Sequence, residues 1–251
     1  MIGVVHLLPL PGSPGYGGSM QRVVARAEKD AAAYAAGGVH ALVVENYGDA
    51  PFYKEHVPAE TIAALTRCAL AVGEAAKLPI GINVLRNDAR AALGVAAAVG
   101  ATFVRINVHS GAVVTDQGII EGRAAETLRA RRALEADIKI FADVHVKHGR
   151  PLVARPIAHA ASDVVNRGGA DALIVSGPAT GSPTDLDDLR AVRDALPDAM
   201  LLAGSGVTAS NVAGVLAIAD AVIVGTALKR GGKTSNPVDP ARVKRLVAAT
   251  K

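Results

Sequence analysis

Two segments carry polar side chains in a pattern typical of acid–base chemistry. The segment ADVHVKH, at residues 142–148, alternates Asp143, His145 and Lys147 with small or apolar residues. Such alternation places all three on one face of an extended strand. Glu45 ends another short apolar run, Ala41–Glu45. We predict that these four residues are catalytic, with a carboxylate as the base. Lys147 or His145 would act as the acid or stabilise developing negative charge.

Further polar residues follow other apolar runs and form the predicted substrate site. In the segment FVRINVH, at residues 103–109, polar residues again take every second position. Another run ends in Asn83 and is followed by Arg86, Asn87 and Asp88. Each residue alone is as compatible with a structural role, but so many polar groups at one place favour a binding site, because buried charges are costly unless paired. The predicted substrate-binding residues are His6, Asn83, Arg105, Asn107, His109, Ser176, Thr180 and Gly181.

Two glycine-containing turns near the C-terminus favour a phosphate site. Glycine permits positive φ and a close approach of the backbone to a ligand, and the N-terminus of a helix attracts anions. The expected donors include the Ser205 and Thr226 hydroxyls and a helix that begins at Thr226. Tight turns without a ligand remain the alternative, and a dinucleotide site is disfavoured because no acidic residue ends the next strand. The predicted phosphate-binding residues are Gly204, Ser205, Gly206, Gly225 and Thr226.

Eight short apolar runs alternate with helical patterns, which is typical of a parallel sheet with crossover helices. The expected strands span residues 2–7, 41–45, 80–84, 103–108, 138–144, 172–175, 200–203 and 221–224. The expected helices span residues 20–36, 58–77, 88–99, 121–134, 157–167, 185–196 and 240–249, with further helices from 209 and from 226. We predict a single (β/α)8 TIM barrel over residues 1–251, with an open doubly wound sheet as the alternative. In such barrels the active site lies at the C-terminal ends of the strands.

Composition limits the partners. The net charge of +4 is mild, so we expect an anionic small molecule and no nucleic acid. A single cysteine, Cys68, excludes an intrachain disulfide and a cysteine-based zinc site. No compact ligand motif is present, so no cofactor or metal is predicted. A divalent metal at Glu45, Asp143, His145 or His6 and a Schiff base at Lys147 remain minority alternatives.

The sequence shows no basic leader and no apolar run of the ~18 residues that a membrane-spanning helix requires. We therefore expect a cytoplasmic protein with no membrane span. We also expect a homo-oligomer.

Longer segments of the chain resemble the BtpA family. They are GVVHLLPLPGSPGYGGS, VVENYGDAPFY, GINVLRNDARAAL, VRINVHSGAVVTDQGIIEGRAAETLR, ADVHVKH, ALIVSGPATGSPTDL, AGSGVTASNV and IVGTALK. The resemblance covers nearly the whole chain and implies a barrel of the ribulose-phosphate-binding type. The family is named for a protein needed for photosystem I accumulation in cyanobacteria. It also occurs in bacteria and archaea with no photosystem, which implies a more general activity.

Two functions follow from these observations. The first is an enzyme of phosphorylated sugars or nucleotide-like metabolites, with lyase, isomerase or transferase chemistry. The second is a non-catalytic assembly or stability factor, of the kind that the family name implies for photosystem I biogenesis. A concave polar mouth favours the enzyme, whereas a broad exposed apolar patch would favour the assembly factor.

Overall fold

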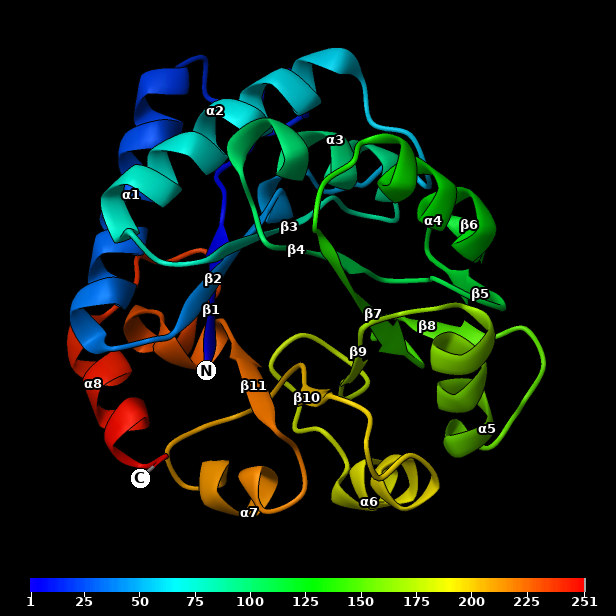
Figure 1. The fold of residues 1–251 in the computed structure, drawn as a ribbon. Coiled ribbons are helices and arrows are strands. Elements are labelled where there is room, and N and C mark those ends of the chain that lie inside the picture. Colours follow the sequence, from blue (N-terminus) through cyan, green and yellow to red (C-terminus); the bar gives the residue numbers. More distant parts are fainter. Residues whose placement is uncertain (251) are drawn as a thin grey trace.

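The computed structural model describes residues 1–250. Eight parallel strands form a closed barrel in the order β1-β11-β10-β9-β7-β4-β3-β2, and helices surround it (Figure 1). The predicted TIM barrel is confirmed, and the open sheet is excluded. The barrel strands are β1 (Ile2–His6), β2 (Ala41–Glu45), β3 (Ile80–Asn83), β4 (Phe103–Ile106), β7 (Lys139–Val144), β9 (Ala172–Val175), β10 (Leu201–Ala203) and β11 (Ala221–Val224). The helices are α1 (Met20–Gly37), α2 (Ala59–Ala76), α3 (Ala89–Val99), α4 (Ala124–Ala133), α5 (Ile157–Ser162), α6 (Leu186–Ala195), α7 (Val212–Leu216) and α8 (Pro240–Ala248).

The barrel interior is apolar at one end and polar at the other. Phe103 stacks on Phe141, with ring centroids 4.6 Å apart, within a cluster that also contains Ile174 and Leu202. Side chains two positions apart on a strand share a face, so Arg105 lies on the same face of β4 as Phe103. The apolar cluster therefore fills one end of the barrel, and the polar groups gather toward the C-terminal ends of the strands.

Helix ends follow the expected capping chemistry. The Ser19 hydroxyl accepts a hydrogen bond from the backbone N–H of Arg22 at the start of α1, and Gly38 ends that helix with φ of 88°. The Asp88 carboxylate caps α3 through the N–H of Ala91. Asp88 also accepts from the N–H of Val57, at 2.9 Å, so this cap ties the loop after β2 to α3.

A small antiparallel sheet lies in two segments where no strand was expected, the one between the strand 103–108 and the helix 121–134 and the one after residue 144. It has the order β6-β5-β8 and consists of β5 (Ala112–Thr115), β6 (Gly118–Glu121) and β8 (Gly149–Pro151). The expected helix start at Glu121 was wrong for the same reason, and α4 begins at Ala124. Val113 pairs with Ile120 and both are buried against Val108 and Val146. This sheet joins the loops that follow β4 and β7.

The helices expected from residues 209 and 226 are short. The helical pattern from residue 209 gives only the five residues of α7. At Thr226 the chain forms a single 3-10 turn, Thr226–Leu228. The chain there continues toward Lys229, which is fully buried and pairs with Asp30 of α1 at 3.1 Å. The ion pair between Lys229 and Asp30 thus ties the chain after Thr226–Leu228 to α1, where a helix from residue 226 was expected.

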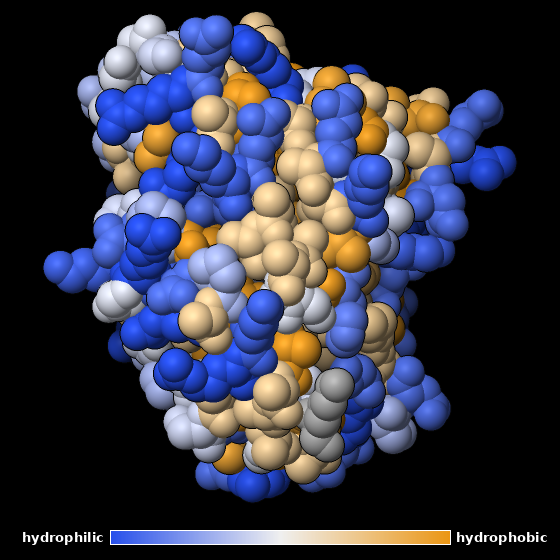
Figure 2. Space-filling model, turned by 90° about the vertical axis from the view of Figure 1, so that its left-hand side faces the viewer, coloured by the Kyte–Doolittle hydropathy of each residue, from blue (hydrophilic) through white to orange (hydrophobic). Residues whose placement is uncertain are grey.

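The outer face over α1, α2 and α8 mixes hydrophilic side chains with smaller hydrophobic areas (Figure 2). Among residues 1–250, no helix combines the length and the apolar character needed to cross a membrane.

Candidate active site

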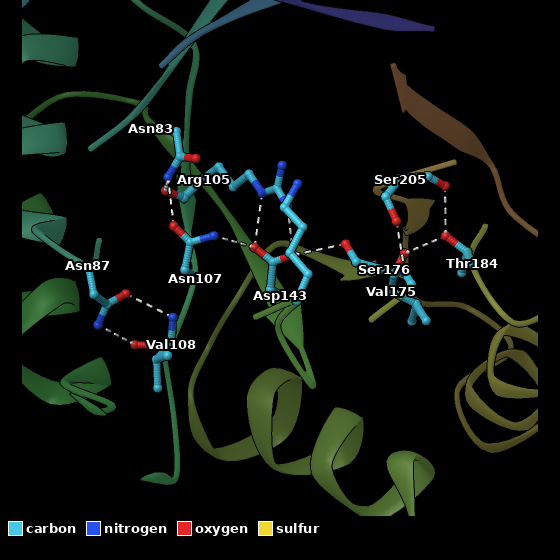
Figure 3. A network of polar contacts seen from close by, with 12 residues as sticks. Asn83, Asn87, Arg105, Asn107, Val108, Asp143, Val175, Ser176, Thr184 and Ser205 are labelled. Carbon is cyan, nitrogen blue, oxygen red and sulfur yellow. Dashed lines mark hydrogen bonds and ion pairs between the residues drawn. The ribbon is translucent and has the colours of Figure 1, made fainter. Parts of the chain in front are cut away.

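Asp143 and Arg105 form the centre of a buried polar network inside the barrel (Figure 3). Arg105 donates two hydrogen bonds to the Asp143 carboxylate, from Nε at 2.9 Å and from Nη2 at 2.8 Å. Asn107 donates to the same carboxylate at 3.0 Å and accepts from Asn83 at 3.0 Å. The Ser176 hydroxyl donates to Asp143 at 3.4 Å. Four predicted substrate-binding residues are thus brought together with one predicted catalytic residue, Asp143.

The hydrogen bonds of this network occupy the lone pairs with which the Asp143 carboxylate would accept a proton as a general base. The Asp143 carboxylate receives four hydrogen bonds, and its side chain is fully buried. Burial opposes the charge on Arg105, but the Asp143 carboxylate outweighs it and raises the pKa of the guanidinium. A carboxylate held in this way is suited to positioning its neighbours.

Glu45 is the carboxylate that faces the open mouth of the barrel. Its side chain is 6% exposed, and its Oε1 atom lies 3.8 Å from Nε2 of His6. Glu45, His6 and Lys147 line a cavity of about 190 Å³, which we call the smaller mouth cavity. They also line a neighbouring cavity of about 490 Å³, the larger mouth cavity. The structure therefore brings two of the predicted catalytic residues, Glu45 and Lys147, to one space.

The environment of Lys147 favours a readily exchanged proton. Burial, together with the nearby positive charge of Arg105, lowers the pKa of Lys147 from 10.5 to about 8, and Glu45 opposes this shift. A group with such a pKa can donate a proton near neutral pH. Burial also lowers the pKa of His6 well below 6.5, so His6 is neutral at neutral pH.

The two glycine-containing turns line the smaller mouth cavity together with Thr180 and Gly181. Within residues 1–250, no hydrogen bond involves the backbone N–H groups of Gly206, Gly225 or Thr226. Gly206 has φ of 64°, and a Cβ atom there would lie 2.3 Å from the backbone of Pro183. Glycine is therefore required at position 206. The N–H groups of Gly206, Gly225 and Thr226 remain without a partner within residues 1–250.

The two hydroxyl groups predicted to bind phosphate already have protein partners. Ser205 accepts a hydrogen bond from the N–H of Gly177 at 2.8 Å and donates to the carbonyl of Ser182 at 2.9 Å. Thr226 shares a hydrogen bond with the hydroxyl of Thr234 at 2.8 Å. The Ser205 hydroxyl therefore holds the loop after β9 in place, and the backbone N–H groups are the better candidates for anion binding.

Two predicted site residues, His145 and His109, lie outside the mouth. His145 has φ of 51°, which breaks the strand alternation after Val144. It lines, together with Asp143 and Asn107, a third cavity of about 260 Å³ beside α5. His109 follows the end of β4, and its Nε2 atom lies 2.8 Å from the carbonyl of Gly168. The expectation that His145 shares a strand face with Lys147 was wrong, because β7 ends at Val144 and the alternation ends with it.

The larger mouth cavity contains residues that were not among the predicted site residues. Arg86, Tyr47, Phe52 and His148 line it, together with the predicted residues Asn107 and Thr180. His148 contacts the Thr180 hydroxyl at 2.9 Å. The position of Arg86 after β3 was the available signal, whereas nothing in the local pattern indicated Tyr47 or Phe52.

In the described part of the chain, no three His, Cys, Asp or Glu side chains are grouped in a way that would hold a metal ion. The nearest approximation at the mouth is the pair of Glu45 and His6.

The model of the BtpA family matches residues 1–251. The chain belongs to the BtpA family. One family member is the photosystem I biogenesis protein BtpA of a Synechocystis strain, which is 47% identical over 99% of this chain and 87% of its own length. Membership is therefore supported over the whole chain and includes both glycine-containing turns.

Solved structures similar to this BtpA-family chain are TIM-barrel enzymes. Phosphoribosyl anthranilate isomerase from Thermus thermophilus superposes with a TM-score of 0.58 and 14% identity, over 99% of this chain and 96% of that one. Orotidine 5'-phosphate decarboxylase from Pyrococcus horikoshii gives 0.55 and 17%, over 100% and 99%. At these identities the likeness establishes the fold alone.

Proposed function

We propose that this chain is an enzyme that binds a phosphorylated small metabolite at the mouth of the barrel and catalyses acid–base chemistry on it. The observation that carries the proposal is the composition of the smaller mouth cavity. Glu45, Lys147 and the glycine-containing turns at 204–206 and 225–226 line this one space. A phosphate at the turns would therefore hold the rest of the molecule beside a carboxylate and an ammonium group.

Backbone N–H groups supply the phosphate site. The N–H groups of Gly206, Gly225 and Thr226 lack a partner in the described chain, and these three residues line the smaller mouth cavity. Successive N–H groups in turns form anion-binding concavities, and the loops after strands seven and eight commonly bind phosphate in such barrels. β10 and β11 are the seventh and eighth strands of this barrel along the chain. Both structural neighbours are also named for phosphorylated compounds.

Glu45 and Lys147 supply the chemistry. The Glu45 carboxylate removes a proton from a carbon atom next to a carbonyl group. The Lys147 ammonium group donates a hydrogen bond or a proton to the carbonyl oxygen as negative charge develops there. The Arg105–Asp143 pair holds the floor of the site and does not exchange protons.

Binding is tested by calorimetric titration with a panel of sugar phosphates and nucleotides. Thr226→Asp places a negative charge among the N–H donors and should abolish binding by charge repulsion. Thr226→Asn introduces a side chain of nearly the same shape as Asp but without the charge, and this variant should retain binding. Equal binding by wild type and Thr226→Asp would place the phosphate elsewhere.

Catalysis is tested by proton exchange in deuterated water. Wild type should introduce deuterium next to the carbonyl group of a bound ketose phosphate, as followed by NMR. Glu45→Gln should bind the same compound and leave its protons unexchanged. If Glu45→Gln exchanges as fast as wild type, Glu45 is not the base.

The name of the Synechocystis relative refers to photosystem I biogenesis. A non-catalytic assembly role would be favoured if no compound of the panel binds and the chain instead co-purifies with membrane complexes. The cytoplasmic location and the homo-oligomeric state belong to the proposal. Cell fractionation and light scattering test them.

A further inference from the structure

Arg86 is a buried cation whose guanidinium group is largely without acceptors. Its residue is 5% exposed, and it lines the larger mouth cavity. In the described residues its side chain makes one hydrogen bond, from Nη2 to the carbonyl of Lys147 at 2.6 Å, and no ion pair. A guanidinium group has five N–H donors. Most of the binding capacity of Arg86 is therefore unused by the protein.

A buried guanidinium group without a carboxylate partner is costly. Burial is the main influence on Arg86 and lowers its pKa, whereas Asp143 and Glu45 act on it only through their charge. Arg105 differs, because it is 2% exposed and its guanidinium group has a two-point contact with Asp143. Of these two buried arginines at the mouth, Arg105 has a carboxylate partner. Arg86 has none and lines the larger mouth cavity.

The positions of Arg86 and of the glycine-containing turns define two ends of the site. The turns line the smaller mouth cavity and Arg86 lines the larger one. Glu45 and Lys147 line both cavities and so lie where the two meet. A ligand that occupies both cavities has its reacting atoms at the junction, with one end at the turns and the other at Arg86.

The charge balance also favours a second anion. The buried or largely buried charged groups at the mouth are three cations, Arg86, Arg105 and Lys147, and two carboxylates, Glu45 and Asp143. Asp116 lines the same cavity but is exposed. One cation is therefore left without a buried counter-charge, in addition to the N–H groups of the turns.

We propose that Arg86 binds a second anionic group of the substrate, a carboxylate or a phosphate, at the end opposite the phosphate that the turns hold. This inference rests on the proposed function and narrows its substrate class to small metabolites with two anionic ends. A guanidinium group binds either anion through two parallel hydrogen bonds, so both chemistries are retained. Tyr47 and Phe52 line the same cavity as Arg86.

Calorimetric titration with three compounds of equal carbon length tests the proposal: ribose phosphate, phosphoribonate and ribulose bisphosphate. The second carries a carboxylate and the third a second phosphate at the far end. In wild type, the second anionic group should increase affinity by about tenfold or more. The compound with the larger gain identifies the anion that Arg86 prefers.

Three variants assign the gain to Arg86. Arg86→Gln should lose the gain in affinity that the second anionic group gives in wild type. Arg86→Lys should keep part of it, because a point charge remains without the two-point geometry. Arg132→Gln, an exposed position on α4, removes the same charge and should keep the full gain.

The outcomes separate this inference from the proposed function. If ribose phosphate binds in a manner that Thr226→Asp abolishes, but neither second anion adds affinity, the role of Arg86 is wrong and the proposed function stands. If none of the three compounds binds wild type, both fail. If Arg86→Gln does not fold, the three wild-type affinities and those of Arg86→Lys still test the inference. Equal affinity of wild type for all three compounds overturns it without any variant.

Discussion

The guanidinium group of Arg105 and the carboxylate of Asp143 meet in a two-point contact at 2.9 and 2.8 Å beneath the mouth of the barrel (Figure 3). Both side chains are almost completely buried. Since Asn107 and Ser176 also donate to this carboxylate, the pair acts as a fixed floor for the site. Glu45 and Lys147 line both the smaller and the larger mouth cavity.

Asp143→Asn should destabilise the fold, because it leaves the Arg105 guanidinium buried without a counter-charge. The expected loss is about 3 kcal/mol or more in the free energy of unfolding, as for other broken buried ion pairs. Urea unfolding followed by circular dichroism measures it. Asp137→Asn removes a carboxylate from an exposed pair with Lys139 and should leave the midpoint unchanged. An Asp143→Asn variant as stable as wild type would show that the contact is not structural.

Lys147 should be unusually reactive toward acylating reagents near neutral pH. Only the neutral amine reacts, and burial lowers the pKa of Lys147 to about 8. The labelling rate of its peptide, measured by mass spectrometry, should therefore rise with pH and reach half its maximum near pH 8. Glu45→Gln should move this midpoint lower, because the Glu45 carboxylate raises the pKa of Lys147. A midpoint near 10.5, the ordinary value, would contradict the burial of this ammonium group.

The same pKa shift has a consequence for stability. The folded chain releases the Lys147 proton near pH 8 and the unfolded chain near 10.5, so the unfolded state binds more protons between these values. The contribution of Lys147 to stability is therefore least favourable below pH 8 and improves as pH rises to 10.5. Lys147→Met should gain stability relative to wild type at pH 7, and this gain should shrink across the window. A gain that does not change with pH would exclude the titration of Lys147 as its cause.

Glu45→Gln should bind inorganic phosphate more tightly than wild type. The substitution removes a negative charge from the lining of the smaller mouth cavity. The expected gain is about 1 kcal/mol, or about fivefold in affinity. Lys147→Met should change affinity in the opposite direction. Glu74→Gln, on the exposed side of α2, is the matched control and should have no effect in the same calorimetric titration.

Lys229→Met should destabilise the protein because Asp30 loses one of its two cationic partners. The loss should be smaller than the ~3–5 kcal/mol of a buried carboxylate left without any partner, since Arg26 remains 3.2 Å from Asp30. Asp30 also accepts a hydrogen bond from the N–H of Val238 at 2.7 Å, so the loop after β11 should loosen as well. Denaturant unfolding measures the loss, and Lys233→Met is the exposed control. Adding Asp30→Asn to Lys229→Met should recover part of the stability. A double variant that is less stable than Lys229→Met would contradict this account.

Much of the barrel was predictable from the sequence because its strands are short, apolar and regularly spaced. The caps at Ser19 and Asp88 and the inward direction of Arg105 and Asp143 follow from local rules of this kind. Alternation holds only while the chain remains extended, and this is why the prediction was wrong for His145, whose φ of 51° turns it toward α5.

The candidate site was less predictable because it depends on contacts between loops. The sequence placed Glu45 and Asp143 in equivalent positions, and only the hydrogen bonds of the folded chain distinguish a free carboxylate from a saturated one. The Ser205 hydroxyl was assigned to a ligand, although its partners lie in a loop more than twenty residues away in sequence. Val113 and Ile120, paired across the small sheet, carried a strand signal that the loop assignment overlooked.

The pairing of β1 with β11 has a consequence for synthesis. β1 has β2 on one side from early on, but its other edge is filled only by residues 221–224, close to the end of the chain. An unpaired strand edge readily pairs with another chain. A nascent chain of this protein therefore exposes one unpaired strand edge until residues 221–224 have left the ribosome. Translation stopped before residue 221 should yield aggregates rather than a partly folded barrel.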